Sequence, residues 1–90
     1  MSKYKIFETE VFVEDLKANL GSDYKRIVKK LSEQVYPILR ESPFYGSNIK
    51  KLRGLKPDRW RYRIADYRFF YIVEDDLVIM IAAQHRKDSY

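Results

Sequence analysis

The chain contains no cysteine and a single histidine, His85. The missing thiols exclude disulfide bonds, thiol catalysis and thiolate metal sites. One histidine leaves no multi-histidine metal centre, and the sequence has neither a Gly-rich phosphate loop nor a Ser-His-Asp spacing. We therefore expect a function that uses no metal ion and no organic cofactor.

Glycine and proline are also scarce, with three of each in 90 residues. Their scarcity argues against long linkers, and the length fits one domain over residues 1–90. The first residues lack the apolar core of a signal peptide, and the longest apolar run, residues 77–83, is far too short to span a bilayer. We expect a cytoplasmic protein.

Positive charge is abundant and lies mostly in the second half of the chain. The formal net charge is +5, and residues 46–90 hold 10 basic and 6 acidic residues. Between residues 50 and 63, seven basic residues accompany a single acid, Asp58. This clustering is typical of proteins that bind phosphate-rich partners, although a solvated basic surface explains the charge alone equally well.

The first half of the chain predicts one strand followed by two helices. Residues 3–8 are rich in β-formers, and Thr9 is suited to cap a helix that runs to Gly21. Ser22 or Asp23 then caps a second helix with one apolar face.

Pro37 interrupts the second helix, because its nitrogen cannot donate to the carbonyl of Glu33. We expect a kink there and an end before Ser42-Pro43.

The second half predicts an antiparallel sheet. Residues 43–58 form a connecting loop around the short segment 49–52. Strands are expected over residues 59–64, 67–74 and 77–83, joined by two-residue hairpin turns. The predicted fold is therefore α+β, in the order β-α-α-β-β-β, with two N-terminal helices packed on one face of an antiparallel sheet.

Two-residue turns bring arginines together. They place Arg63 opposite Arg68 and put Arg61 on the same face. The same alternation through the second hairpin pairs Arg68 with Ala83, so His85 is also expected on that face. Like charges directly opposite each other destabilise a sheet by up to about 1 kcal/mol per pair, which suggests that this cluster has a function.

The other face of these strands is aromatic and is expected to receive the helices. The far end of the arginine face is apolar as well. Its residues either belong to the core or form a docking groove for another protein, and the sequence favours neither. They are Phe70, Ile72, Ile79 and Ile81.

The available chemistry is cationic. A phosphodiester is cleaved without metal when a ribose 2′-hydroxyl attacks, provided that cations stabilise the phosphorane and other groups move protons. The arginines suit phosphate binding, because guanidinium is a bidentate fork. His85 suits proton transfer, unless it only caps its strand, and Tyr90 suits base stacking, unless it is a frayed chain end.

Four segments together resemble the RelE/ParE superfamily of toxins from toxin–antitoxin pairs, and more closely its RelE branch. They are Lys50-Lys51-Leu52-Arg53-Gly54-Leu55, Trp60-Arg61-Tyr62-Arg63-Ile64, Asp66-Tyr67-Arg68-Phe69-Phe70-Tyr71 and Ala83-Gln84-His85-Arg86-Lys87-Asp88-Ser89-Tyr90.

The resemblance implies a RelE-like fold and a metal-independent endoribonuclease that cuts mRNA on the ribosome and inhibits translation. Arg61 and Arg63 stand where the family has basic residues, and Arg68 matches its phosphate-stabilising arginine. Arg86 matches the arginine after the last strand. The resemblance further implies proton transfer by His85, base stacking by Tyr90, and contacts with ribosomal RNA by Lys50, Lys51, Arg53 and Lys56.

It also implies a cognate antitoxin protein, with Phe70, Ile72 and Ile79 as candidate contacts. The alternative is a ParE-like toxin that binds DNA gyrase and has no nuclease activity. A third possibility is a degenerate member that retains only antitoxin binding.

Overall fold

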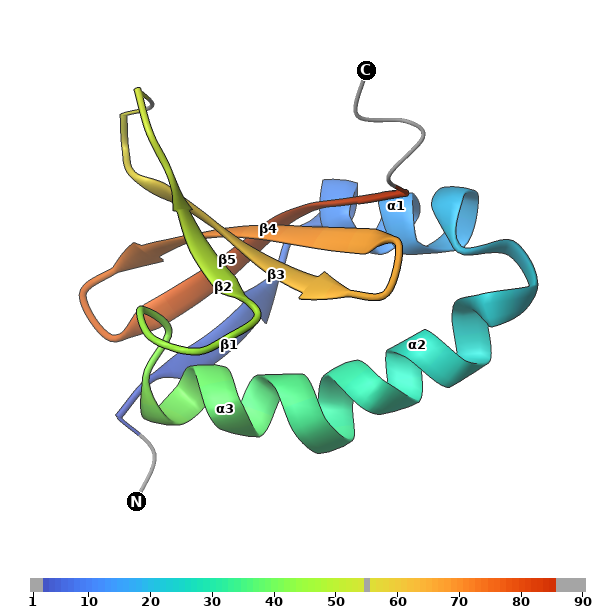
Figure 1. Cartoon of the computed structure of the whole chain (residues 1–90), viewed down its shortest axis with the longest axis horizontal. Helices are drawn as coiled ribbons and strands as arrows, with labels where there is room; N and C mark the ends of the chain where they lie inside the picture. Colours follow the sequence, from blue (N-terminus) through green and yellow to red (C-terminus); the bar gives the residue numbers. More distant parts are fainter. Residues whose placement is uncertain (1–2, 55, 86–90) are drawn as a thin grey trace.

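The protein is an α+β sandwich in which all helices cover one face of a five-stranded sheet (Figure 1). The computed structural model describes residues 3–54 and 56–85. The strands are β1 (Lys5–Glu8), β2 (Ile49–Leu52), β3 (Arg59–Ile64), β4 (Tyr67–Glu74) and β5 (Leu77–His85). The helices are α1 (Glu10–Asn19), α2 (Tyr24–Lys30) and α3 (Tyr36–Glu41).

The strand order is β1-β5-β4-β3-β2, so the predicted fold class is confirmed with two corrections. The sheet is mixed, because β1 pairs with β5 in parallel. The segment expected within a loop is strand β2, antiparallel to β3. A four-residue strand with two central lysines gives little signal of its own, and it is held by pairing with β3.

The first helix begins and ends where the sequence predicts. The Thr9 side chain accepts a hydrogen bond from the Phe12 N–H at 3.2 Å, and Gly21 has a φ of 54°. Asp23 occupies the N-cap position of α2 but makes no capping bond with its side chain. Its carboxylate instead accepts a hydrogen bond from the Tyr67 hydroxyl.

The disturbance expected at Pro37 takes the form of a π-helical turn over Leu31–Val35. The Tyr36 N–H donates to the carbonyl of Leu31, five residues back, and the helix then continues through the proline to Glu41. The widened turn accommodates a residue that cannot donate.

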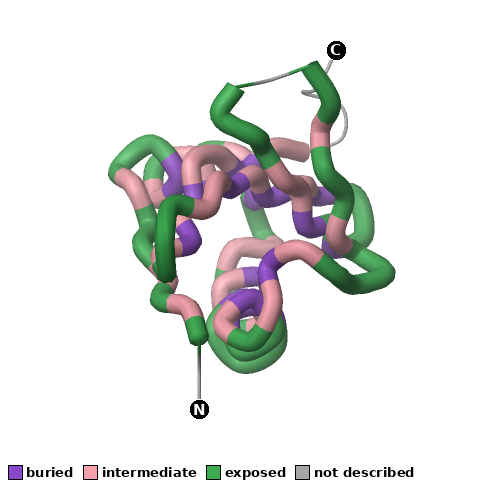
Figure 2. Tube along the Cα trace, turned by 90° about the vertical axis from the view of Figure 1, so that its left-hand side faces the viewer, coloured by how far each residue is buried: buried purple, intermediate pink, exposed green. Residues whose placement is uncertain are grey.

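The core lies between the helices and the covered face of the sheet, where the buried parts of the trace gather in Figure 2. Phe12 of α1 packs edge-on against Phe69 of β4, with ring centroids 6.3 Å apart. In the described residues no helix is both long and apolar enough to cross a membrane.

The last hairpin contains a β-bulge that the sequence does not predict. Val73 pairs with Val78 as expected, but the register shifts between Phe70 and Tyr71, and Ile81 is the extra residue on β5. Beyond the bulge, Arg68 therefore lies opposite Gln84 and not Ala83.

Candidate functional site

The uncovered face of the sheet carries a cluster of cations. Arg63 lies opposite Arg68, as predicted, and Lys50 of β2 lies opposite Arg61 of β3. Paired residues point to the same face, so the four side chains converge on it. With Leu52 they line a cavity of about 310 Å³, called here the arginine pocket.

Burial and mutual repulsion act on the centre of this pocket. Desolvation lowers the pKa of Arg61 below its ordinary value, and the charges of Arg68 and Arg63 lower it further. The Arg61 Nε is buried, and no hydrogen-bond acceptor is found for it. Arg63 Nε donates to the carbonyl of Ala65 at 3.0 Å, which holds that side chain along the turn.

No acid offsets these charges within the described part of the chain. The two ion pairs found there lie elsewhere, between Arg26 and Asp23 and between Lys51 and Asp58, both at 3.2 Å. Arg61 and Arg68 are half-buried and Arg63 is exposed. Uncompensated guanidinium groups placed together in this way favour an anion with several oxygens, and a phosphate group fits this description.

His85 does not join the pocket, so the predicted convergence with the arginines is wrong. The bulge pairs His85 with Tyr67, and their rings meet edge to face with centroids 5.0 Å apart. Tyr67 is a core residue, so His85 lies on the helix-covered side of the sheet. The inserted residue reverses the alternation of side chains along β5. Gln84 therefore takes the place on the uncovered face that was predicted for Ala83 and His85.

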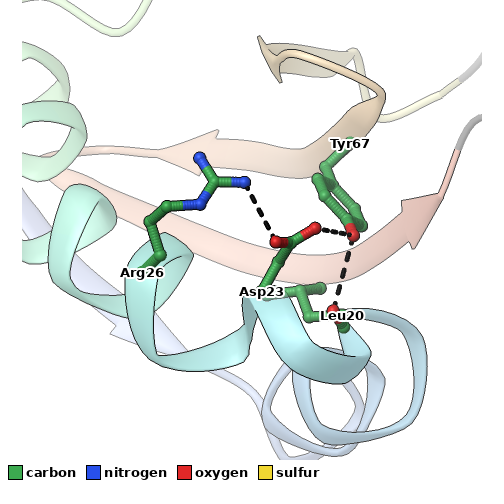
Figure 3. A network of polar contacts seen from close by, with 4 residues as sticks. All are labelled: Leu20, Asp23, Arg26 and Tyr67. Carbon is green, nitrogen blue, oxygen red and sulfur yellow. Dashed lines mark hydrogen bonds and ion pairs between the residues drawn. The ribbon is translucent and has the colours of Figure 1, made fainter.

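Tyr67 connects the sheet to the junction between α1 and α2 (Figure 3). Its hydroxyl donates to the Asp23 carboxylate at 2.8 Å and lies 3.4 Å from the carbonyl of Leu20. The hydrogen bond from Tyr67, and then that from Arg26, lowers the pKa of Asp23, and the same carboxylate raises the pKa of Tyr67. The single histidine thus lies beside a structural network.

The four lysines and arginines expected to bind RNA divide into two groups. Lys50 belongs to the arginine pocket, whereas Lys51, Arg53 and Lys56 line a second cavity of about 620 Å³ at the β2–β3 connection, together with Asp58. This connection projects from the body of the molecule at the upper left of Figure 1. Lys51 Nζ also lies 5.9 Å from the Trp60 ring centroid, so Lys51 is oriented by its neighbours.

The apolar residues of the uncovered face lie outside the core. Phe70, Ile72 and Ile79 are half-buried, and Phe7 beside Ile79 on β1 is 53% exposed. This apolar surface is continuous with the arginine pocket, because Phe70 lies opposite Arg61. Arg86 and Tyr90 lie outside the described residues.

Gln84 of β5 also lies on the uncovered face, beside the arginine pocket, although the sequence does not predict this position. Strict alternation along β5 assigns it to the covered face, and only the bulge brings it beside Arg68. No turn residue or composition signal marks the position of the bulge, so it cannot be predicted from the sequence.

Comparison with known proteins identifies the family. The family model described as the ParE toxin of type II toxin–antitoxin system, parDE, matches residues 9–90. The chain belongs to the RelE/ParE superfamily of type II toxins. No curated protein matches the sequence significantly.

Solved structures support the RelE-like branch of this superfamily. The RelE of the RelB-RelE complex from Methanococcus jannaschii is similar over 91% of this chain and 92% of that chain, with 29% identity and a TM-score of 0.67. A double arginine-to-alanine mutant of free Escherichia coli RelE covers 99% of this toxin and 88% of its own chain, with 25% identity and a TM-score of 0.65. The YoeB dimer from Staphylococcus aureus shares the fold, with 22% identity, coverage of 93% and 98%, and a TM-score of 0.70.

Proposed function

We propose that this toxin is a ribosome-dependent endonuclease that cleaves mRNA by metal-independent attack of a ribose 2′-hydroxyl and so inhibits translation. The observation that carries the proposal is the arginine pocket, where Lys50, Arg61, Arg63 and Arg68 meet without an acid among the described residues. A toxin that acts only by binding a protein has no need of such a cluster.

The pocket suits the charge that develops during this reaction. The 2′-hydroxyl loses its proton to solvent and its oxygen forms a bond to phosphorus. The bond to the 5′-oxygen breaks and that oxygen takes up a proton from solvent, so the products are a 2′,3′-cyclic phosphate and a 5′-hydroxyl. Arg61 and Arg68 would bind the non-bridging oxygens, whose charge increases in the pentavalent transition state. Preorganised cations stabilise such charge most effectively in a partly desolvated site, and Arg61 is partly desolvated.

His85 does not transfer a proton in this scheme, because its imidazole ring lies on the covered face of the sheet and not in the arginine pocket. In the sequence Arg86 comes directly after β5, and Tyr90 comes four residues later. Both remain proposed site residues, with Tyr90 stacking on a base. The pocket itself supplies phosphate binding and electrostatic stabilisation.

The projecting β2–β3 connection is the proposed contact with ribosomal RNA. Lys51, Arg53 and Lys56 line the cavity there, which shares Leu52 with the arginine pocket, and their charges suit the phosphate backbone. A toxin that acts on ribosomes would work in the cytoplasm.

A cognate antitoxin is the proposed partner of the apolar surface made by Phe70, Ile72 and Ile79. Solved relatives include RelE with RelB from Pyrococcus horikoshii and YoeB with YefM from Staphylococcus aureus. An antitoxin on this surface would border the arginine pocket and obstruct access by RNA.

The second candidate is a ParE-like toxin that binds DNA gyrase and does not cleave RNA. The matching family model, which describes a ParE toxin, favours it. The two candidates differ in the nucleic acid that is broken.

The test is to induce the protein in growing cells and map mRNA 5′ ends on ribosomes and breaks in DNA. We expect ribosome-associated mRNA cuts that fall by roughly 100-fold in Arg68→Ala, the loss typical of removing one transition-state contact. Lys29→Ala removes a positive charge from an exposed position on α2, and it should cut like the wild type.

DNA breaks without mRNA cuts would favour the gyrase candidate. Unchanged mRNA cutting in Arg68→Ala would overturn the assignment of the pocket. If neither mRNA nor DNA is broken, the remaining interpretation is a protein that only binds its antitoxin.

A further inference from the structure

The β-bulge places a neutral amide beside the arginine pocket. Arg63, Arg68 and Gln84 lie opposite one another on β3, β4 and β5 and form one row across the uncovered face. The ring contact between Tyr67 and His85 fixes the next row on the covered face. Gln84 must therefore point toward the pocket side of the sheet.

Side chains of α1 and the residue before it hold β5 in this register. The Ala83 N–H donates to Asp15 Oδ2 at 3.0 Å, and Asn19 Nδ2 donates to the Ala83 carbonyl at 2.7 Å. On the other side of the bulge, Thr9 Oγ1 donates to the Met80 carbonyl at 2.8 Å. The backbone on both sides of Ile81 is thus fixed, and Gln84 follows the fixed Ala83 directly within a strand.

The chemistry of Gln84 differs from that of its neighbours in the pocket. Guanidinium and ammonium groups bind phosphate, which is the same on every nucleotide, so they position RNA without reading its sequence. A glutamine amide has both a donor and an acceptor and can pair with the edge of a base. Phe70 lies one row away, half-buried, and offers an aromatic surface on which that base could stack.

We propose that Gln84 is a specificity-determining residue that reads the edge of the base whose phosphate lies in the arginine pocket. This inference rests on the proposed function, because it assigns Gln84 to the same RNA site. It adds that the choice of base at the cleaved position depends on this one amide.

The experiment compares cleavage by purified wild-type protein, Gln84→Ala and Gln84→Glu on ribosomes programmed with an mRNA library randomised at the A-site codon. Gln34→Ala is the matched control, since it makes the same substitution at an exposed glutamine of the helical side. Thermal melting checks that each variant folds. If Gln84→Ala melts early, Gln84→Glu retains the shape of the side chain and provides the comparison.

We expect the wild type and Gln34→Ala to share a base preference, and Gln84→Ala to lose roughly tenfold of that discrimination, as expected for one good base contact. Gln84→Glu only accepts hydrogen bonds, so its preference should shift toward bases with exocyclic amino groups. Three results would overturn the inference but not the proposed function. They are an unchanged base preference in both Gln84 variants, no base preference in the wild type, and loss of all cleavage in both Gln84 variants. Absence of cleavage by the wild type would instead overturn the proposed function.

Discussion

At the level of single residues, positively charged side chains on the uncovered face of the sheet repel one another. Arg63 and Arg68 lie directly opposite each other, and Arg61 is partly desolvated beside both. This arrangement opposes stability, since like charges across strands repel and burial disfavours a charged group. A bound anion would reduce this repulsion, and we therefore propose that the cluster is an anion-binding site.

His85 shows the opposite behaviour. It lies beside the hydrogen-bonded Asp23 and Tyr67, where its positive charge would help to lower the pKa of Asp23. The charged and polar groups around Asp23 thus stabilise the covered side, whereas those of the arginine pocket are the proposed binding site on the other face.

The Tyr67 network predicts a pH dependence of stability. The pKa of Asp23 is lowered below its ordinary value of 3.8, mainly by the Tyr67 hydroxyl. The stabilisation is therefore present above about pH 4 and is lost as the pH falls through the lower folded pKa. Tyr67→Phe should lower the Tm at pH 7, and the difference from the wild type should narrow below pH 4.

Thermal melts of the two proteins from pH 2.5 to 8 test this prediction. The contact with Leu20 does not titrate, so part of the difference should remain at low pH. A difference in Tm that stays constant over the whole range would show that Asp23 is not the partner that matters.

At the scale of secondary-structure elements, much of the sheet was predictable from local pattern. The bounds of β3 and β4 and both two-residue turns follow from alternation and spacing, as does the pairing of Arg63 with Arg68. These features depend on neighbouring residues in the sequence. The aromatic covered face was predicted for the same reason.

The remaining features depend on contacts between distant segments. The parallel pairing of β1 with β5 joins residues more than 70 positions apart, and the bulge at Ile81 lies where β5 extends past β1 onto α1. No residue type at the bulge predicts it from the sequence. The register that places the arginines was consequently predicted correctly between β3 and β4, whereas the register between β4 and β5 was predicted incorrectly beyond the bulge.

The contact between α1 and β5 predicts a measurable contribution to stability. Asp15→Ala removes the acceptor of the Ala83 N–H in a strand residue that is fully buried. An unsatisfied buried donor costs about 1–3 kcal/mol, so we expect a loss of this size in urea unfolding. Asp15→Asn retains an acceptor oxygen and should lose less than half as much; equal losses in the two variants would contradict this account.

At the scale of the whole molecule, the two faces of the sheet have separate tasks. The covered face and the helices form the core, whereas the uncovered face presents cations at one end and apolar side chains at the other. The projecting β2–β3 connection adds a third, basic surface. The net charge of +5 is thus concentrated where RNA is proposed to bind.

We propose above all that the arginine pocket promotes attack by a ribose 2′-hydroxyl on mRNA. The most direct measurement uses purified protein and ribosomes programmed with one of two mRNAs, identical except for a single 2′-deoxy nucleotide at the mapped cleavage site. We predict cleavage of the all-ribose mRNA with a 2′,3′-cyclic phosphate end, and no cleavage at the 2′-deoxy position. Equal cleavage of both mRNAs would contradict the account.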